Sequence, residues 1–155
     1  VAFIGDGDCN VARSWIWAAA RCGFELVIAA PTKFQPPQHL LDQADGRVTV
    51  TTDCAKAARG AHVLYTDVWV SMGKEDEEAY RLAQFQGYQI NSSLLHEAPK
   101  ALVMHCLPAY RGKEIDDQTF EAHSETIFRQ AENRLHAQKA VLQMIAAGRK
   151  TDVIS

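Results

Sequence analysis

The chain has 155 residues, of which 47% are hydrophobic and 23% are charged, and this composition is typical of one soluble globular domain with a real core. Its formal net charge of −3 gives no electrostatic basis for binding nucleic acid or an anionic membrane surface. No run of about 18 apolar residues predicts a membrane span, and the four cysteines show no CxxC spacing, which argues against a zinc knuckle or a disulfide framework and favours a reducing cytosol.

The chain opens with a β-turn-α-β pattern. The apolar run 1–4 breaks at Gly5-Asp6-Gly7, and a helical pattern follows from Val11 to Arg21, with Gly23 as a plausible residue just past the helix end. A second apolar run covers 25–30. Because a core strand begins at the first residue, we expect an excised domain whose preceding part lies elsewhere, and we expect no signal peptide.

The first turn invites a nucleotide-binding interpretation, which the residues do not support. Gly5-x-Gly7 begins like GxGxxG, but the third glycine position holds Asn10, and Ala30-Pro31 stands where the ribose-binding acid belongs. The turn still offers backbone N–H groups and the Asn10 amide at a helix N-terminus, where a carboxylate or phosphate is favoured. An ordinary N-cap is an equally good interpretation of Asn10.

The remaining elements follow by the same alternation of apolar runs and helical patterns. We expect strands at 47–50, 61–65, 88–90 and 101–104, helices at 38–43, 54–59, 75–86, 91–97 and 116–122, and a last long helix from about Gln130 to Ala147, before a loose tail at 149–155. Strands alternating with helices predict a three-layer α/β fold, with a Rossmann-like parallel sheet covered by helices on both faces.

The segment around His105 carries the strongest functional signal. The apolar run 101–104 stops at His105-Cys106-Leu107-Pro108, which places His105 and Cys106 at the carboxyl end of a core strand. Ligands bind at that edge of parallel sheets, although Cys106 taken alone could be a buried structural thiol. The polar segments Gly5–Asn10 and Asp67–Gly73 follow strands in the same way, so the three segments together predict a site.

Three motifs resemble the second, ornithine-binding domain of the ornithine carbamoyltransferases. They are Asp67-Val-Trp-Val-Ser-Met-Gly73, His105-Cys-Leu-Pro108 and Ala131-Glu-Asn-Arg-Leu-His-x-Gln-Lys-Ala140. They occur in order and the likeness covers nearly the whole chain, which implies a binding domain at 1–148 followed by a flexible tail at 149–155. The Ser-Met-Gly loop is the most specific, because it differs in relatives that take aspartate or acetylated ornithine. Cys9 departs from the family, which commonly has asparagine there.

The resemblance implies a role for each matching position. Asn10 would hold the ornithine α-carboxylate, while Asp67, Ser71 and the Met72 backbone would hold the amino end. Cys106 and Leu107 would meet the side-chain amine and the carbamoyl group, Arg134 would contact the carbamoyl oxygen, and His105 would orient the loop or that oxygen. The catalytic set implied in this way is Asp67, Cys106 and Arg134.

The activity implied by the resemblance is carbamoyl transfer from carbamoyl phosphate to the δ-amine of L-ornithine, giving L-citrulline and phosphate. An alkylammonium with a pKa of about 10.4 must lose a proton before it attacks. We therefore expect Asp67 to act first in positioning and specificity, Arg134 to stabilise the charged oxygen, and Cys106 not to act as a covalent nucleophile. No cofactor and no metal are expected, and a zinc ion on His105 and Cys106 would be adventitious or inhibitory.

The family's carbamoyl-phosphate-binding loop, of the type Ser-x-Arg-Thr-Arg, is missing from this sequence. The chain would then be half of a cytoplasmic enzyme of arginine or citrulline metabolism, whose complete form is expected to be a homo-oligomer, namely a trimer. In the family the last helix crosses back to pack on the first domain, and the helix here has apolar residues on two faces. The alternatives are a carbamoyltransferase for another amino acid or amine, and a non-catalytic amino-acid-binding module.

Overall fold

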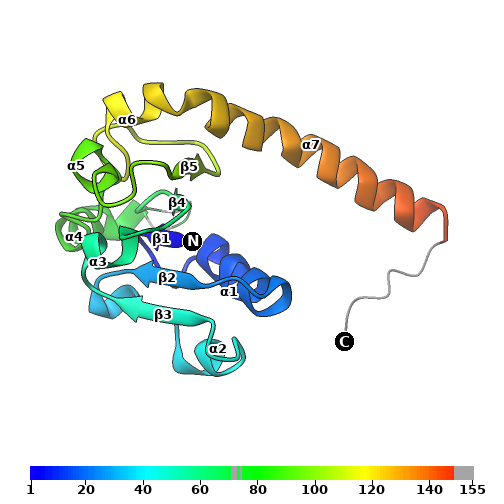
Figure 1. The fold of residues 1–155 in the computed structure, drawn as a ribbon, viewed down its shortest axis with the longest axis horizontal. Coiled ribbons are helices and arrows are strands. Elements are labelled where there is room, and N and C mark those ends of the chain that lie inside the picture. The colour runs from blue at the N-terminus through cyan, green and yellow to red at the C-terminus, as the bar shows by residue number, and fades with distance from the viewer. Residues whose placement is uncertain (71–72, 74, 149–155) are drawn as a thin grey trace.

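The sheet consists of five short parallel strands in the order β3-β2-β1-β4-β5 (Figure 1). The computed structural model of the chain describes residues 1–70, 73 and 75–148. The strands are β1 (Ala2–Ile4), β2 (Leu26–Ala29), β3 (Val48–Thr51), β4 (Val63–Thr66) and β5 (Leu102–His105). Parallel pairing throughout confirms the Rossmann-like sheet that the sequence predicts.

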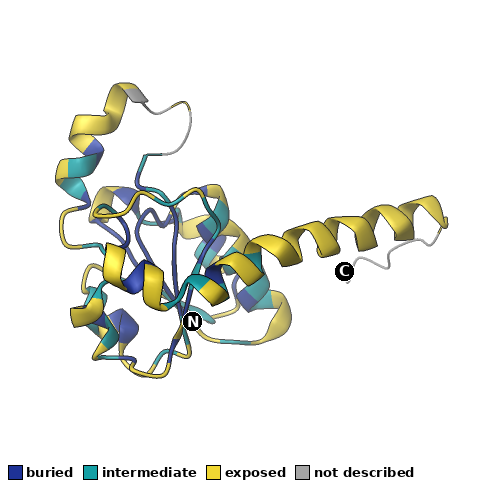
Figure 2. Ribbon diagram, turned by 90° about the horizontal axis from the view of Figure 1, so that it is seen from above, coloured by how far each residue is buried: buried dark blue, intermediate teal, exposed yellow. Residues whose placement is uncertain are grey.

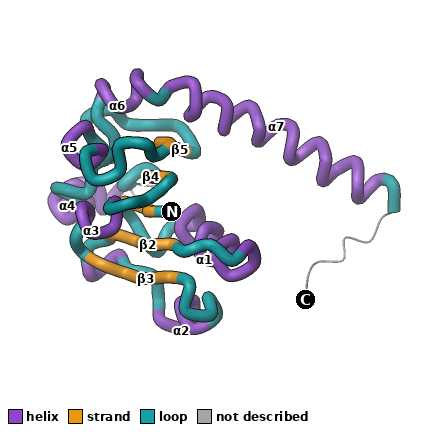
Figure 3. The backbone as a smooth tube through the Cα atoms, viewed as in Figure 1, coloured by secondary structure: helices purple, strands orange, loops and turns teal. Residues whose placement is uncertain are grey.

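Helices and short 3-10 turns connect these strands, as Figure 3 shows. The α-helices are α1 (Asn10–Cys22), α2 (Gln38–Asp42), α3 (Cys54–Ala58), α4 (Glu78–Gln84), α5 (Ser92–Leu95), α6 (Asp117–Ala122) and α7 (Ser124–Ala146). The 3-10 turns are η1 (Thr32–Phe34) and η2 (Glu75–Glu77). None of the helices in the described ranges is long and apolar enough to cross a membrane.

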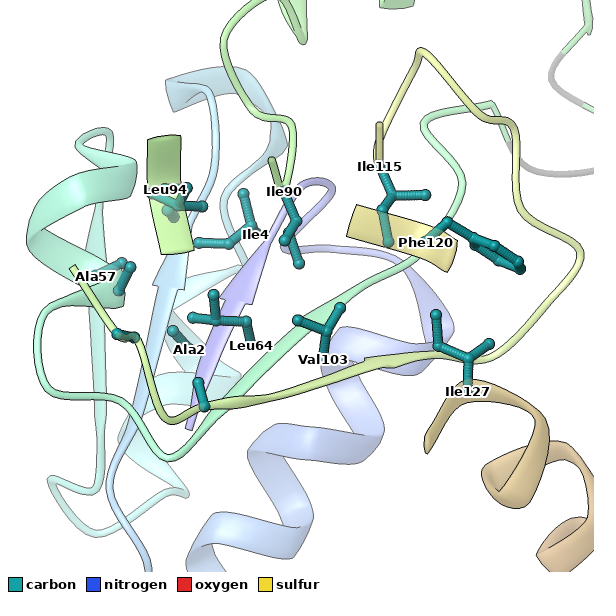
Figure 4. Packing of buried hydrophobic residues seen from close by; sticks show 14 residues of the cluster. Ala2, Ile4, Ala57, Leu64, Ile90, Leu94, Val103, Ile115, Phe120 and Ile127 are labelled. Atoms are coloured by element: carbon teal, nitrogen blue, oxygen red, sulfur yellow. The ribbon is translucent and has the colours of Figure 1, made fainter. Parts of the chain in front are cut away.

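Alternation along the strands divides the core between the two faces of the sheet. On β1, Ala2 and Ile4 join a cluster with residues of α3, α5, α6 and the start of α7, whereas Phe3 joins a second cluster with α1. Figure 4 shows Ile4, Leu64 and Val103, from three neighbouring strands, in the first of these clusters. Helices therefore cover both faces, which gives the three layers.

Capping residues explain where several helices begin and end. The Asp53 carboxylate accepts a hydrogen bond from the Lys56 N–H at the start of α3, and the Asn91 side chain accepts one from the Leu94 N–H at the start of α5. Gly23 ends α1 with φ of 75°, a left-handed conformation that glycine adopts without steric cost. The sequence predicts the boundaries at Gly23 and Asn91, and it leaves Thr52 and Asp53 as alternative caps at the start of α3.

The structure differs from the sequence-based expectation at three other elements. Residues 88–90 form no strand of the sheet, because Ile90 makes only an isolated bridge with Ile115. The segment expected as one helix over 75–86 is the turn η2 followed by the shorter α4. The last helix begins at Ser124 rather than near Gln130, since Ile127 already packs into the core one turn after the helix starts.

The helix α7 reaches far beyond the sheet. Ile127 is buried in the core, whereas every position from 131 to 148 is exposed. Figure 1 shows the helix leaving the body, and Figure 2 shows its distal part coloured as exposed throughout. Among the described residues, the buried contact between the body of the domain and α7 lies in the first two turns of the helix.

Candidate functional site

The strand order places the candidate site between β1 and β4. The chain runs outward from β1 through β2 to β3, then returns to the other side of β1 with β4 and β5. The register pairs Ile4 with Thr66 and Thr66 with His105, so these strands end at one level of the sheet. Ligands of parallel α/β folds bind at the carboxyl edge where the strand order reverses in this way.

A pocket of about 290 Å³ lies at this edge. It collects the start of α1, the loops after β4 and β5 and one residue of α7, and it is lined by Asn10, Val11, Asp67, Val68, Val70, Cys106, Leu107, Pro108, Tyr110 and Arg134. Five of the predicted site residues meet here although they are distant in the sequence. Ser71 and Met72 lie outside the described residues.

Asp67 and Cys106 form a hydrogen-bonded pair in the pocket. The Cys106 Sγ donates to Asp67 Oδ1 over 2.9 Å, and the Val68 N–H donates to the same oxygen over 2.8 Å. Burial raises the pKa of the Cys106 thiol well above its ordinary value, and the hydrogen bond to the Asp67 carboxylate raises it further. The thiol is therefore protonated at neutral pH, which makes it a poor nucleophile and a good donor to Asp67.

Asn10 stands at the N-terminus of α1 without acting as its cap. The cap is Cys9, whose Sγ accepts a hydrogen bond from the Ala12 N–H over 3.4 Å. Asn10 is the first residue of the helix and its side chain is exposed at the pocket. The ordinary N-cap interpretation of Asn10 is thus wrong, and the helix N-terminus provides a favourable electrostatic setting for an anion.

His105 lies beneath the pocket rather than on its surface. Its side chain is fully buried, its Nε2 lies 3.1 Å from Glu114 Oε1, and its Nδ1 accepts the Leu107 N–H over 2.9 Å. Because Nδ1 is an acceptor, Nε2 carries the proton that is shared with Glu114. The structure therefore gives His105 the role of holding the Cys106–Leu107 turn, in which Leu107 adopts a left-handed φ of 58°.

Sequence reasoning missed Glu114, which is also fully buried. Besides His105, its Oε1 accepts the Tyr110 N–H over 2.6 Å, so one carboxylate oxygen fixes both ends of the loop that forms a pocket wall. The sequence shows only that a glutamate follows His105 nine positions later. Nothing in that spacing signals a buried contact.

Arg81 is a second buried charge that the sequence does not reveal. Its guanidinium donates to Asp6 Oδ2 over 2.8 Å and to the Trp69 carbonyl over 3.0 Å, while its Nε donates to Glu77 over 3.0 Å. Asp6 belongs to the turn after β1 and Trp69 to the loop after β4. This ion pair therefore ties the turn between β1 and α1 to the loop after β4, and residues of α1 and of that loop line the pocket.

Arg134 is the predicted site residue that lies on the part of α7 that extends away from the body of the domain. It lies on the exposed part of α7, yet its side chain lines the pocket. The pocket is therefore negative at Asp67 and positive at Arg134, with the polar Asn10 beside the first turn. Such an arrangement fits a small zwitterionic ligand with an additional polar group.

A parallel α/β domain with a polar pocket at its strand-order reversal belongs to the class of Rossmann-like small-molecule-binding domains. Residues 1–145 match the family model described as "Aspartate/ornithine carbamoyltransferase, Asp/Orn binding domain". The chain belongs to this family, as the three sequence motifs predict.

Curated and solved relatives carry the name of one branch of this family. The chain is 51% identical over 152 residues to the ornithine carbamoyltransferase of Methanoculleus marisnigri, covering 96% of this chain and 49% of the relative. The ornithine carbamoyltransferase of Akkermansia muciniphila is also 51% identical, with 97% and 50% covered. The chain thus spans about half the length of the curated relatives it matches.

Solved structures give the same result. The anabolic ornithine carbamoyltransferase from Campylobacter jejuni superposes with a TM-score of 0.90 at 36% identity, covering 96% of this chain and 51% of that one. The ornithine carbamoyltransferase from Gloeobacter violaceus gives a TM-score of 0.79 at 44% identity, with 91% and 49% covered. The α/β fold is shared over nearly the whole chain.

Proposed function

We propose that this chain is the amino-acid-binding half of an ornithine carbamoyltransferase. The complete enzyme would transfer the carbamoyl group of carbamoyl phosphate to the δ-amine of L-ornithine, giving L-citrulline and phosphate. The observation that carries the proposal is the Asp67–Cys106 pair, joined over 2.9 Å in a pocket that Asn10 and Arg134 also line. The family match and the names of the relatives support the same reaction.

The charge of the pocket favours ornithine over aspartate as the amino acid. Asp67 is largely buried, at 8% exposed, so its carboxylate would attract an ammonium group and would repel the side-chain carboxylate of aspartate. The opposite end of the ligand would lie near Asn10, where the amide and the N-terminus of α1 favour the α-carboxylate. Ser71 and the Met72 backbone complete the proposed amine-binding set by resemblance.

The chemical step forms a C–N bond and breaks a C–O bond. The neutral δ-amine attacks the carbonyl carbon and forms a tetrahedral intermediate with negative charge on the carbonyl oxygen. The carbonyl then re-forms, phosphate leaves with its bonding pair, and the proton that the nitrogen loses goes to the departing phosphate. Arg134 would donate to that oxygen as its charge develops. The Leu107 carbonyl and Cys106 would direct the amine hydrogens, so the attacking lone pair faces the carbonyl carbon.

The carbamoyl-phosphate-binding half would be a separate domain, since the basic loop of the family is missing from this sequence. We assign the amino-acid-binding domain to residues 1–148 and regard 149–155 as its tail. We further propose that the complete protein is a cytoplasmic homo-oligomer, most simply a trimer, and that no metal or cofactor takes part.

A comparison of this chain alone with the complete enzyme tests this function. The chain alone should form no citrulline from ornithine and carbamoyl phosphate, whereas the complete enzyme carrying both halves should form it. A panel of ornithine, lysine, putrescine, N-acetylornithine and aspartate, followed by phosphate release, defines the acceptor. If the enzyme prefers another acceptor, that acceptor replaces ornithine in the proposal. No turnover with any of them would favour a non-catalytic amino-acid-binding module.

A further inference from the structure

Arg81 of α4 contacts loops at both sides of the pocket, although it does not line the pocket itself. Its side chain is buried, at 7% exposed, and one nitrogen, Nη1, donates both to Asp6 Oδ2 over 2.8 Å and to the Trp69 carbonyl over 3.0 Å. The guanidinium also lies over the ring of Phe34, 4.9 Å from its centroid. Because a buried charge without its partners is costly, these contacts hold Arg81 and its partners in fixed positions.

Asp6 organises the turn that presents Asn10 to the pocket. Its Oδ1 accepts the Asp8 N–H over 3.0 Å, and its backbone carbonyl accepts the Cys9 N–H over 3.3 Å. Cys9 is the N-cap of α1, and Asn10 is the first residue of that helix. The side chain that pairs with Arg81 therefore also fixes the start of α1, and with it the position of the Asn10 amide.

Trp69 fixes the segment that carries Asp67 on the other side of the pocket. Its indole is buried, at 7% exposed, and stacks on Phe85 with 5.9 Å between centroids and 16° between planes. Its two neighbours in the chain both line the pocket. Phe85 thus holds the ring of Trp69 while Arg81 holds its carbonyl, so the backbone that follows Asp67 has a fixed course.

The backbone ladder fixes only where these two loops begin. Ile4 pairs with Thr66 at the end of β1 and β4, and the Thr66 hydroxyl donates to the Ile4 carbonyl over 2.7 Å. Asp6 follows Ile4 by two residues and Trp69 follows Thr66 by three, so both lie past the last ladder pair. Arg81 bridges the loops at this point, and the spacing between them depends on that bridge.

We propose that Arg81 and Asp6 are positioning residues that determine specificity, because they set the spacing between Asn10 and Asp67. The inference rests on the proposed function, in which Asn10 holds the α-carboxylate and Asp67 attracts an ammonium group. An acceptor that carries both groups must meet both side chains at once, so its binding depends on their spacing. A diamine without a carboxylate has no such requirement. The bridge therefore favours amino-acid acceptors over plain diamines.

The experiment uses the complete enzyme with three changes at this bridge. Arg81→Met keeps the apolar stem and removes the charge, whereas Arg81→Lys keeps a charge for Asp6 but loses the planar fork of donors. The double variant Asp6→Asn with Arg81→Met removes both charges, so that no unpaired charge stays buried. It keeps the test valid if Arg81→Met alone fails to fold.

Arg47→Met is the matched control. Like Arg81, Arg47 contacts one backbone carbonyl and one carboxylate, since its Nη1 donates to the Gly23 carbonyl over 3.1 Å and to Glu25 over 3.2 Å. Arg47 does not line the pocket, and neither of its two partners does. The control therefore removes an arginine with a similar set of contacts without changing the spacing of the pocket loops.

The readout is the ratio of kcat/KM for L-ornithine to kcat/KM for putrescine, which is ornithine without the α-carboxylate. The ratio should fall by roughly tenfold in Arg81→Met and in the double variant, and by less in Arg81→Lys. The loss should arise from a higher KM for ornithine, with kcat within about twofold of wild type. Arg47→Met should keep the wild-type ratio. A loss of folded enzyme lowers both values of kcat/KM alike and leaves the ratio unchanged.

Titration calorimetry of the same proteins with ornithine and with putrescine measures the preference without turnover. If the wild-type enzyme forms no citrulline, the proposed function fails, and the ratio of the two Kd values still decides the role of Arg81. An unchanged ratio in the double variant, or an equal fall in Arg47→Met, would overturn the inference. A wild-type enzyme that binds ornithine no more tightly than putrescine would also overturn it, since it has no carboxylate preference for Arg81 to set.

Discussion

At the residue scale, Asp67 serves both the fold and the proposed substrate. Its Oδ1 accepts from the Val68 N–H and from Cys106, which fixes the carboxylate at the end of β4. Asparagine can keep these two bonds through its own oxygen but loses the negative charge. In the complete enzyme, Asp67→Asn should therefore raise the KM for ornithine by about tenfold or more and change kcat little.

Steady-state kinetics with ornithine as the varied substrate measure this effect. Circular dichroism of the variant should match the wild type, since the two hydrogen bonds remain. A variant whose KM is unchanged while its kcat collapses would assign Asp67 to proton transfer instead of binding.

Arg134 gives the second prediction at this scale. Its proposed partner is an oxygen that gains charge only in the transition state, so Arg134→Ala should lower kcat by about 100-fold with a smaller effect on KM. Arg129→Ala is the matched control, because Arg129 lies on the same helix, pairs with Glu125 over 2.7 Å and does not line the pocket. Equal losses in the two variants would show that α7 merely needs positive charge.

The sequence predicts the site residues that follow strands better than it predicts the buried residues that hold the pocket loops in place. Asn10, Asp67 and Cys106 could be assigned to one edge because each belongs to a polar segment that follows an apolar run, and the structure brings them to one pocket. Glu114 and Arg81 could not, because their burial depends on tertiary approach. Arg81 reaches Asp6 across 75 positions of the chain, and no local periodicity encodes such a contact.

At the element scale, the start of α1 combines a helix cap with a buried thiol. Cys9 is 7% exposed, and burial raises its pKa from 9.0 to about 12. Because the thiol ionises more readily in the unfolded chain, its stabilising contribution is fully present below about pH 9 and is lost as the pH rises toward about 12. Cys54, with a pKa raised to about 11, adds to the same alkaline loss.

Cys9→Ser separates the cap from the ionisation. Serine can cap α1 through its oxygen and does not titrate in this range. Urea unfolding at about pH 7 and at about pH 10 should therefore show a smaller loss of unfolding free energy for Cys9→Ser than for the wild-type chain. The same alkaline loss in both proteins would mean that the other raised groups account for the effect.

Helix boundaries show a different limit of sequence-based prediction. The cap Asn91 was predictable, and Asp53 was one of two candidates with Thr52, because these side chains are standard N-cap types. The start of α7 was not, since His123 precedes the helix without a side-chain cap bond. What fixes that start is the burial of Ile127 against the sheet, which only the folded structure reveals.

At the scale of the whole molecule, α7 exposes more apolar surface than a domain of this size usually tolerates. Val141 is 53% exposed and Met144 41%, and Leu135, Leu142 and Ile145 are exposed to a similar or greater degree. Figures 1 and 2 show this part of the helix standing clear of the body. In the complete enzyme we expect the other domain to cover it, and in this chain alone it is left without cover.

We therefore predict that the isolated chain self-associates through α7. Val141→Lys with Met144→Lys places two charges on the apolar surface and should convert the chain to a monomer in sedimentation velocity experiments. Gln138→Lys with Gln143→Lys is the matched control, because it adds the same charge to the same helix without removing apolar surface. This control should associate like the wild type. A wild-type chain that sediments as a monomer at every concentration, with the amides of 131–146 protected from hydrogen exchange, would show that α7 is stable without any cover.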